Sequence, residues 1–352
     1  MDLPGNSPGR WLVTGGCGFV GRNLIRRILS RPDVTLRIVD NLSVGSKAEL
    51  ARITQFATTD SDALGHPSNK NRKVELVVGD IRDDALAIRV AEGADVIVHL
   101  AASTGVAPSV ADPRFDCTTN VLGILNYLEA ARKCAVKRFV FASSGAPIGE
   151  CSPPIHEELA PHPVSPYGAS KLAGEGYCSA YSRTFGINTV ALRFGNCYGP
   201  FSSHKESVVA KFIRESLMGI PWEIYGDGRQ TRDFVYVDDI AAAIELAATL
   251  DGIGGETFQI ATNSETTVLD LARSLAAILQ SHGIAPPPIQ YQASRVGDVK
   301  RNFSDTRKAR TRLGWQAMVS LDAGLRRTVE WFLTEGKPSN TAPSLFHSRR
   351  QR

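Results

Sequence analysis

The chain has 352 residues, 43% of them hydrophobic and 22% charged, and a formal net charge of +4. This length and composition are typical of a globular α/β protein with one large domain and a second lobe. They argue against a membrane protein, because no run of about 18 apolar residues occurs, and against a nucleic-acid binder, because the basic residues are dispersed.

The cysteines and the N-terminus indicate a cytoplasmic protein. The six cysteines are scattered without a C-x-x-C pair, which favours reduced thiols over disulfides and leaves no metal-binding pattern. Residues 1–9 lack the basic start and the apolar run of a signal peptide. We therefore expect a cytoplasmic location and no bound metal.

A glycine-rich turn follows the first predicted strand. Residues Arg10–Thr14 are predicted to form a short apolar strand, from which Gly15-Gly16-Cys17-Gly18-Phe19-Val20-Gly21 leads into an amphipathic helix. The glycines fit both G-x-G-x-x-G and G-x-x-G-x-x-G spacing. They permit a tight turn and a close approach of the backbone to a pyrophosphate at a helix N-terminus. This pattern predicts a dinucleotide site.

Asp40 ends the second predicted strand, Thr35–Val39, and lies 19 residues after Gly21. A carboxylate at this position accepts hydrogen bonds from an adenosine ribose and repels a 2′-phosphate, which favours NAD over NADP. Arg37 is the obvious objection, but it lies inside the strand rather than after it. The alternative interpretation is that Asp40 is only a helix cap.

Two further predicted strands end in small or polar residues. Val74–Val78 is followed by Gly79-Asp80, where Asp80 either holds an adenine amino group or caps the next helix. Val96–Leu100 opens into Ala101-Ala102-Ser103, small residues that let the backbone lie against a cofactor. Asn120 follows in a helix and needs hydrogen-bond partners if it is buried.

Strands and helices alternate through the first half of the chain. The predicted helix Arg114–Cys134 and the strands Arg138–Ala142 and Asn188–Phe194 continue the alternation, whereas residues 52–73 are predicted to be a polar loop. Short links between such elements imply right-handed crossovers and one parallel sheet. We therefore predict a Rossmann-type, doubly wound α/β sheet in residues 1–194, residues 195–336 that mainly form a smaller C-terminal α/β substrate-binding lobe, and a flexible tail in residues 337–352.

Tyr167 and Lys171 are four residues apart in a predicted helix, so they share one face of it. A phenol with a pKa near ~10 is a poor base at neutral pH. An ammonium beside it and a nearby nicotinamide cation favour the phenolate and are expected to lower this pKa. A decrease of about three units corresponds to roughly 4 kcal/mol. The pair therefore predicts a catalytic base and its cation.

Taken together, these segments resemble the extended short-chain dehydrogenase/reductase superfamily and, within it, the NAD-dependent nucleotide-sugar 4-epimerases. The resemblance covers about residues 10–335 and rests on Thr14–Gly21, Asp40-Asn41, Gly79-Asp80, His99–Ala102, Ser143-Ser144, Tyr167–Lys171, Arg193–Pro200, Arg232–Phe234 and Arg295–Asp298. It implies tightly bound NAD, a UDP-sugar substrate, and a homodimer formed through the helices that hold Asn120 and Tyr167.

The mechanism of this family implies a role for each of three residues. Tyr167, as the phenolate, takes the proton of the sugar 4-hydroxyl while the C4 hydride passes to NAD. The resulting 4-keto sugar turns over within the site and takes the hydride back on its other face. Lys171 holds the ribose hydroxyls and lowers the pKa of the tyrosine, and Ser144 hydrogen-bonds the 4-oxygen and relays the proton.

The same resemblance implies two sets of binding residues. The cofactor-binding set is Gly15, Gly18, Phe19, Val20, Gly21, Asp40, Asn41, Ser43, Gly45, Asp80, Ile81, Leu100, Ala101, Ala102, Asn120, Tyr167 and Lys171. The substrate-binding set is Thr104, Ser144, Tyr167, Asn196, Ser203, Val209, Arg232, Arg295 and Asp298. An arginine near a pyrophosphate makes charge-assisted hydrogen bonds. The alternative for Arg232 and Arg295 is ordinary solvation.

Two departures from the family pattern bear on the reaction. Related 4,6-dehydratases and uronate decarboxylases have acidic residues directly after the catalytic hydroxyl, as a second acid/base, whereas this chain has Gly145 and Ala146. Neither side chain transfers protons, which favours epimerisation. The usual Val-Tyr-Gly is replaced by Pro147-Ile148-Gly149, so we expect this loop to shape the pocket differently.

The loop Ser202-Ser203-His204-Lys205 is expected to lie close to the sugar, where its hydroxyls and cation would receive a C6 carboxylate. This predicts epimerisation of UDP-glucuronate to UDP-galacturonate. The alternatives are a UDP-glucose 4-epimerase and a UDP-glucuronate decarboxylase on the same scaffold. A catalytically silent NAD-sensing regulator is an alternative of another class, which has no need of the proton relay of Ser144, Tyr167 and Lys171.

Overall fold

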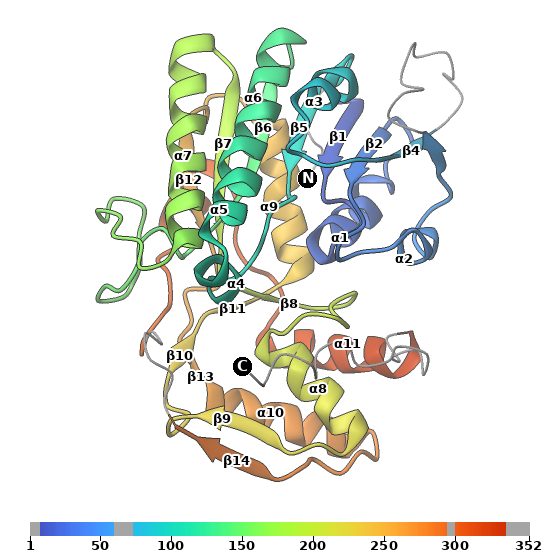
Figure 1. Ribbon diagram of the computed structural model, residues 1–352. Helices are drawn as coiled ribbons and strands as arrows, with labels where there is room; N and C mark the ends of the chain where they lie inside the picture. Colours follow the sequence, from blue (N-terminus) through green and yellow to red (C-terminus); the bar gives the residue numbers. More distant parts are fainter. Residues whose placement is uncertain (1–7, 60–72, 294–299, 336–352) are drawn as a thin grey trace.

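A covered parallel sheet and a smaller lobe make up the molecule in the computed structural model, which describes residues 8–59, 73–293 and 300–335 (Figure 1). The strands of the large sheet are β1 (Arg10–Thr14), β2 (Thr35–Asp40), β3 (Ala57–Thr59), β4 (Val74–Val78), β5 (Val96–His99), β6 (Arg138–Ser144), β7 (Asn188–Phe194) and β12 (Glu256–Ile260). Their order across the sheet is β12-β7-β6-β5-β1-β2-β4-β3, and every pairing is parallel. This confirms the predicted doubly wound sheet.

The chain starts in the middle of the sheet, and this position fixes where a ligand can bind. From β1 it runs outward through β2 and β4, then returns to β5 on the other side of β1 and continues to β6 and β7. The strand order therefore reverses between β1 and β5. In open parallel sheets a crevice forms at the carboxyl ends of the strands at such a point.

Alternate residues of the strands pack under helices on opposite faces, so the strands are apolar throughout. Trp11 and Val13 of β1 belong to the core under α1 (Phe19–Ile28) and α9 (Val237–Thr249), whereas Leu12 belongs to the core on the opposite face. That opposite face is covered by α3 (Asp84–Ala91), α6 (Gly123–Lys133) and α7 (Pro166–Phe185) (Figure 1).

The smaller lobe has its own apolar core. Phe212 stacks on Trp222 with ring centroids 4.7 Å apart, and both side chains are buried. The elements of this part are β8 (Asn196–Tyr198), α8 (Val208–Met218), β9 (Trp222–Tyr225), β10 (Thr231–Arg232), β11 (Phe234–Tyr236), β13 (Thr266–Thr267), α10 (Val268–Ser281), β14 (Ile289–Gln292) and α11 (Leu321–Thr334). The π-helical turn Ala309–Leu313, which precedes α11, packs instead in the core of the large sheet, against α9 and β12. Figure 1 shows α8, α10 and α11 with the pair β9–β14 beneath the large sheet.

Within residues 195–336, some elements belong to the large sheet rather than to the smaller lobe, because the chain returns to the sheet in this range. Strand β12 pairs with β7 along five residues, and α9 packs against α1 and on the sheet. The physical reason is the apolar face of β7, which β12 and α9 cover. The boundary at residue 194 itself stays a prediction.

Two local predictions need correction. The range 52–73, predicted to be a loop, contains the edge strand β3 at residues 57–59; residues 60–72 lie outside the described part. The single helix predicted for Arg114–Cys134 is divided into α5 (Pro113–Cys117), a π-helical turn (Thr118–Leu122) and α6. Such π-turns inside helices are frequent at functional sites, and Asn120 lies in this one.

Candidate active site

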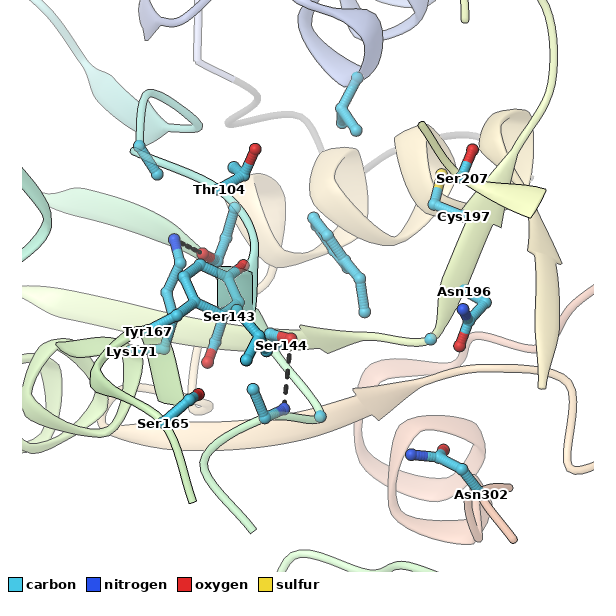
Figure 2. A pocket seen from close by; sticks show the side chains of 18 of the residues that line it. Thr104, Ser143, Ser144, Ser165, Tyr167, Lys171, Asn196, Cys197, Ser207 and Asn302 are labelled. Atoms are coloured by element: carbon cyan, nitrogen blue, oxygen red, sulfur yellow. Dashed lines mark hydrogen bonds between the residues drawn. The ribbon is translucent and has the colours of Figure 1, made fainter. Parts of the chain in front are cut away.

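A cavity of about 660 Å³ lies at the carboxyl ends of β5, β6 and β7, between the large sheet and the smaller lobe. Figure 2 shows Ser143, Ser144, Tyr167 and Lys171 on one side of it, and Asn196, Cys197 and Ser207 on the other. The predicted site residues that line it are Val20, Leu100, Ala102, Thr104, Ser144, Tyr167, Lys171, Asn196 and Val209. The cavity thus brings together residues that the sequence assigns to both the cofactor and the substrate.

Helix α7 presents Tyr167 and Lys171 to this cavity. The helix begins after Ser165, whose hydroxyl accepts a hydrogen bond from the Gly168 amide, and Pro166 occupies its first turn. The ammonium of Lys171 is 3% exposed and donates to the carbonyl oxygen of Ala142 at 2.8 Å. It lies 5.8 Å from the centre of the Tyr167 ring. Phenol and ammonium therefore share one pocket wall, as their spacing predicted.

The protonation of this pair differs from the expectation for Tyr167. Burial raises the pKa of Tyr167 to about 12, although the Ser144 hydroxyl lowers it and Asp116 raises it further. Burial also lowers the pKa of Lys171 to about 8, against the opposing effect of Asp116 and Glu175. The reason is that Lys171 bonds a carbonyl rather than the phenol oxygen, so desolvation dominates both groups.

Ser144 ends β6 and is placed by the turn after it. Its Oγ accepts a hydrogen bond from the amide of Ala146 at 3.2 Å (Figure 2). Gly145 and Ala146 both line the cavity, so the two positions after Ser144 hold no proton-transferring side chain. The loop formed by Pro147, Ile148 and Gly149 turns away, with Ile148 buried and only Gly149 at the cavity.

The glycine-rich turn fits a dinucleotide. Gly15 has a φ of +70°, and a Cβ there would lie 2.7 Å from the Ala101 amide nitrogen; at Gly21 it would lie 2.4 Å from the Gly15 carbonyl. The turn therefore brings the start of α1 directly against the end of β5. Gly18 precedes α1 and has no side chain to cap it. The first amides of α1 thus stay available for an anion such as a pyrophosphate.

Asp40 supports this turn from β2. Its carboxylate accepts hydrogen bonds from the Cys17 amide at 2.9 Å and the Leu42 amide at 2.8 Å, and burial raises its pKa. It caps no helix, because α2 (Lys47–Ala51) is capped by Ser46. Arg37 is engaged elsewhere, with Glu75 at 2.8 Å. Asp40 keeps further acceptor positions, since a carboxylate has about four.

The neighbouring predicted cofactor residues are held by local contacts. Asp80 accepts two hydrogen bonds from the Arg82 guanidinium, which lowers its pKa to about 2, and receives a third from Asn41. The cap of α3 is Asp83 and not Asp80, so the interpretation of Asp80 as a helix cap was wrong.

The other predicted cofactor residues of this region are also fixed by local contacts. The backbone amide of Ser43 donates a hydrogen bond to the side chain of Asn41, and a Cβ on Gly45 would lie 2.0 Å from the Cys17 carbonyl oxygen. The carbonyl of Ile81 accepts from the side chain of Asn126, and Phe19 opens α1.

Asn120 has the partners that its burial demands. Its side-chain amide donates to the Ser103 carbonyl, to Asp116 and to Ser170, and its oxygen accepts from the Ser103 amide. It thereby fixes the segment after β5 against α7, on which Tyr167 and Lys171 lie. Its role toward the cofactor stays a prediction.

The predicted substrate residues are only partly at the cavity. Asn196 is exposed there, with its backbone amide bonded to the Asp233 carbonyl. Ser203 and Arg232 do not line it: Ser203 bonds His204, and Arg232 donates to the Thr231 carbonyl at 2.7 Å. Arg295 and Asp298 lie outside the described residues.

Lys205 enters the cavity from the loop before α8, as predicted for this loop. Arg22 on α1 donates to the Phe201 carbonyl at 2.8 Å, and Arg214 on α8 donates to the carbonyls of Ser203 and Lys205. Both ends of the loop are thus clamped, which turns the Ser203 hydroxyl toward His204. Among the described residues that line the cavity, Lys171 and Lys205 carry the formal charges.

Further residues at the cavity were missed by sequence reasoning. They are Cys197, Ser207, Gln259, Asn302 and Ser304. Gln259 comes from β12, whose return to the sheet was not predicted. The backbone around Asn302 and Ser304 is held by Thr231 and Ile155, which are distant in sequence. No local pattern signals such contacts; the position of both residues shortly after the Arg295–Asp298 motif was the one available sign.

The described residues place no three His, Cys, Asp or Glu side chains where a metal ion would be held. All six cysteines are free. No helix in residues 8–59, 73–293 and 300–335 has the length and apolarity needed to cross a bilayer.

Comparison with known proteins gives consistent matches. Residues 11–261 match the model of the NAD dependent epimerase/dehydratase family. A UDP-glucose 4-epimerase of Mycolicibacterium smegmatis is 37% identical over 328 residues, covering 92% of this chain and 98% of the relative. The UDP-glucose 4-epimerase of Thermotoga maritima, solved with UDP-glucose, superimposes with a TM-score of 0.81 at 35% identity over 92% of this chain and 98% of that one. MoeE5, solved with UDP-glucuronic acid and NAD, superimposes with a TM-score of 0.77 at 29% identity. The match covers 92% of this chain and 99% of that one.

Proposed function

Because this chain belongs to the NAD dependent epimerase/dehydratase family, we propose that it is a 4-epimerase of a UDP-sugar, with NAD as its cofactor. The observation that carries the proposal is one cavity wall that holds Ser144, Tyr167 and Lys171 but has Gly145 and Ala146 beside the catalytic hydroxyl. Such a wall removes and returns one proton and has no second acid/base for elimination or decarboxylation.

The chain's own groups divide the work. Tyr167 accepts the proton of the sugar C4 hydroxyl and later returns it, and Ser144 hydrogen-bonds the same oxygen. Lys171, cationic below its pKa of about 8, favours the phenolate and faces the ribose of the cofactor. When bound, NAD accepts the C4 hydride and gives it back. Because the redox change is reversed within one turnover, the reaction needs no external oxidant.

The cofactor residues carried into this proposal are those around the glycine turn. The amides at the start of α1 bind the pyrophosphate, and Asp40 binds the adenosine ribose. Asp80 and Ile81 would hold the adenine. Leu100, Ala101 and Ala102 lie beside the nicotinamide half, where Ala102 and Leu100 line the cavity.

For the sugar we propose a uronate, which would make the reaction UDP-glucuronate to UDP-galacturonate. The support is Lys205, the cation that the smaller lobe contributes to the cavity, since an ammonium is a suitable partner for a C6 carboxylate. UDP-glucose is the alternative that the names of the relatives favour. Ser203 no longer supports the uronate, because it points to His204.

Substrate choice is tested by replacing Lys205 with methionine, which keeps the length of the side chain and removes its charge. We expect KM for UDP-glucuronate to rise about tenfold or more, and KM for UDP-glucose to change by less than about twofold. The measurement is initial-rate kinetics with both UDP-sugars, with product separation by chromatography. Lys137→Met, an exposed lysine at the opposite end of β6, is the control. Equal or better use of UDP-glucose by the wild type would end the uronate proposal.

The same assay separates the rival activities. A decarboxylase releases carbon dioxide, a 4-reductase or dehydrogenase changes the net amount of NADH, and a silent NAD-binding regulator gives no product. The proposed epimerase releases no carbon dioxide, leaves the net amount of NADH unchanged and forms an epimerised product. The free cysteines agree with a reducing compartment, and we keep a cytoplasmic location as part of the proposal.

We also propose a homodimer formed through the faces of α5, the π-turn and α7. Large apolar side chains are exposed on these elements: Phe115, Leu122, Tyr177 and Phe185, each between 37% and 48%. Burial of such a set in a second copy removes it from water. Light scattering should therefore give twice the monomer mass, and Tyr177→Glu should shift it toward the monomer. Met318→Glu, at an exposed apolar residue elsewhere, should leave the mass unchanged. A monomeric wild type would contradict the proposal.

A further inference from the structure

Lys171 belongs to a buried group of residues that includes carboxylates from two different helices. Glu175 is one turn further along α7, and Asp116 comes from α5, which packs against α7. Both acid side chains are buried, with Asp116 at 1% and Glu175 at 6% exposure. Neither residue lines the cavity, so neither contacts substrate directly. Any effect of these two groups on proton transfer is therefore indirect.

Only one of the two carboxylate oxygens of Asp116 has a hydrogen-bond partner among the described residues. Its Oδ1 accepts a hydrogen bond from the Asn120 side-chain amide at 2.9 Å. The same amide group lies 3.2 Å from the hydroxyl of Ser170, the residue before Lys171. Its Oδ2 is buried and has no hydrogen-bond partner among the described residues. Such an oxygen is costly to bury unless a nearby positive charge compensates for it.

The other charged and titratable groups around Lys171 leave Asp116 as the uncompensated one. Glu175 already accepts hydrogen bonds from one edge of the Arg193 guanidinium of β7, through Nε at 2.8 Å and a terminal nitrogen at 2.7 Å. His99 of β5 is neutral, since burial, aided by Lys171, lowers its pKa to about 3. Tyr167 is a neutral phenol until it loses its proton. Asp116 has no paired cation among the described residues, and the Asn120 amide links it to Ser170, the neighbour of Lys171.

We propose that Asp116 is a positioning residue whose buried charge keeps Lys171 protonated beside Tyr167 in the catalytic cycle. The inference rests on the proposed function, because it assigns Asp116 a part in the same proton transfer. The direction of the shifts agrees: Asp116 raises the pKa of Lys171 and also that of Tyr167. Without that charge, Glu175 would be the remaining group that opposes the effect of burial on the pKa of Lys171.

The sign of the effect follows from these two shifts. The active form needs Tyr167 without its proton and Lys171 with its proton. Removal of the Asp116 charge lowers both pKa values, so the acidic and the alkaline limbs of the kcat profile both move to lower pH. We expect each apparent midpoint to move by about one pH unit. A loss of packing alone would reduce the rate without moving either limb.

Asp116→Asn is the test, because it keeps the shape and an oxygen for Asn120. Two measurements on the NAD-bound protein are compared with wild type: the pH profile of kcat, and the ultraviolet titration of Tyr167, taken as the difference from the same background with Tyr167→Phe. The tyrosine midpoint should fall by about one unit. Asp116→Glu keeps the charge and should stay close to wild type. Asp112→Asn, the exposed cap of α5, is the matched control and should change neither measurement.

Each outcome decides the question. Coincident pH profiles and titrations for wild type and Asp116→Asn would overturn the proposal, as would equal shifts in Asp116→Glu and Asp116→Asn. If Asp116→Asn does not fold, Asp116→Ala removes the same charge with a smaller side chain and must show the same two shifts. The titration needs no substrate. A wild type without epimerase activity would thus refute the proposed function while the titration still tests Asp116.

Discussion

Replacing Tyr167 by phenylalanine is expected to lower kcat by about a thousandfold and to leave the bound NAD in place. The change removes one hydroxyl, which is the proposed proton acceptor, and general acid–base groups contribute about 10² to 10⁴ in rate. The ring itself packs on the pocket wall beside Lys171 and is kept. Cofactor binding depends on the glycine turn at the other end of the cleft, so it should not change.

The measurement is the single-turnover and steady-state rate of epimerisation, together with the NAD released on denaturation. Tyr177→Phe, ten residues further along α7, removes the same hydroxyl from an exposed ring and serves as the control. Near-full activity of Tyr167→Phe would show that the proposed base is wrong. Loss of NAD from this variant would show that the ring also holds the cofactor.

The large sheet was predictable because its strands are short apolar runs buried on both faces. Arg10–Thr14, Val74–Val78 and Asn188–Phe194 have the bounds that the sequence predicts. Strand β12 was not predictable in the same way. Its place beside β7 depends on a crossover of more than 60 residues through the lobe. No pattern within residues 256–260 predicts that they pair with β7.

The site was predictable where spacing alone brings groups together. Tyr167 and Lys171 are one turn apart on α7, so the helix places them without help from other segments. Asp116 was not predictable, because a carboxylate in a short polar helix is usually solvated, and only the packing of α5 on α7 buries it. The burial that raises the pKa of Tyr167 was not predictable for the same reason: desolvation depends on neighbours from several elements.

The largest stability effect is expected behind the site, at the pair of Glu175 and Arg193. Both side chains are buried, at 6% and 5% exposure, and are joined by two hydrogen bonds. Glu175→Gln should lower the free energy of unfolding by about 3 to 5 kcal/mol, because it leaves the charge of Arg193 buried without its partner. Urea denaturation followed by circular dichroism measures this loss. Asp322→Asn, in an exposed ion pair on α11, should cost less than about 1 kcal/mol.

The double variant Glu175→Leu, Arg193→Met tests whether the two charges are coupled, because it removes both of them at once. Apolar residues of similar size often replace a buried ion pair without loss, so the double variant should be more stable than Glu175→Gln alone. If instead the double variant were less stable than either single variant, the charges would not be coupled as their geometry indicates. The recovered fold should still turn over slowly, because Glu175 also accepts the Ser143 hydroxyl at 2.6 Å, next to Ser144. A stable but slow double variant would mean that this ion pair serves the geometry of the site rather than the stability of the sheet.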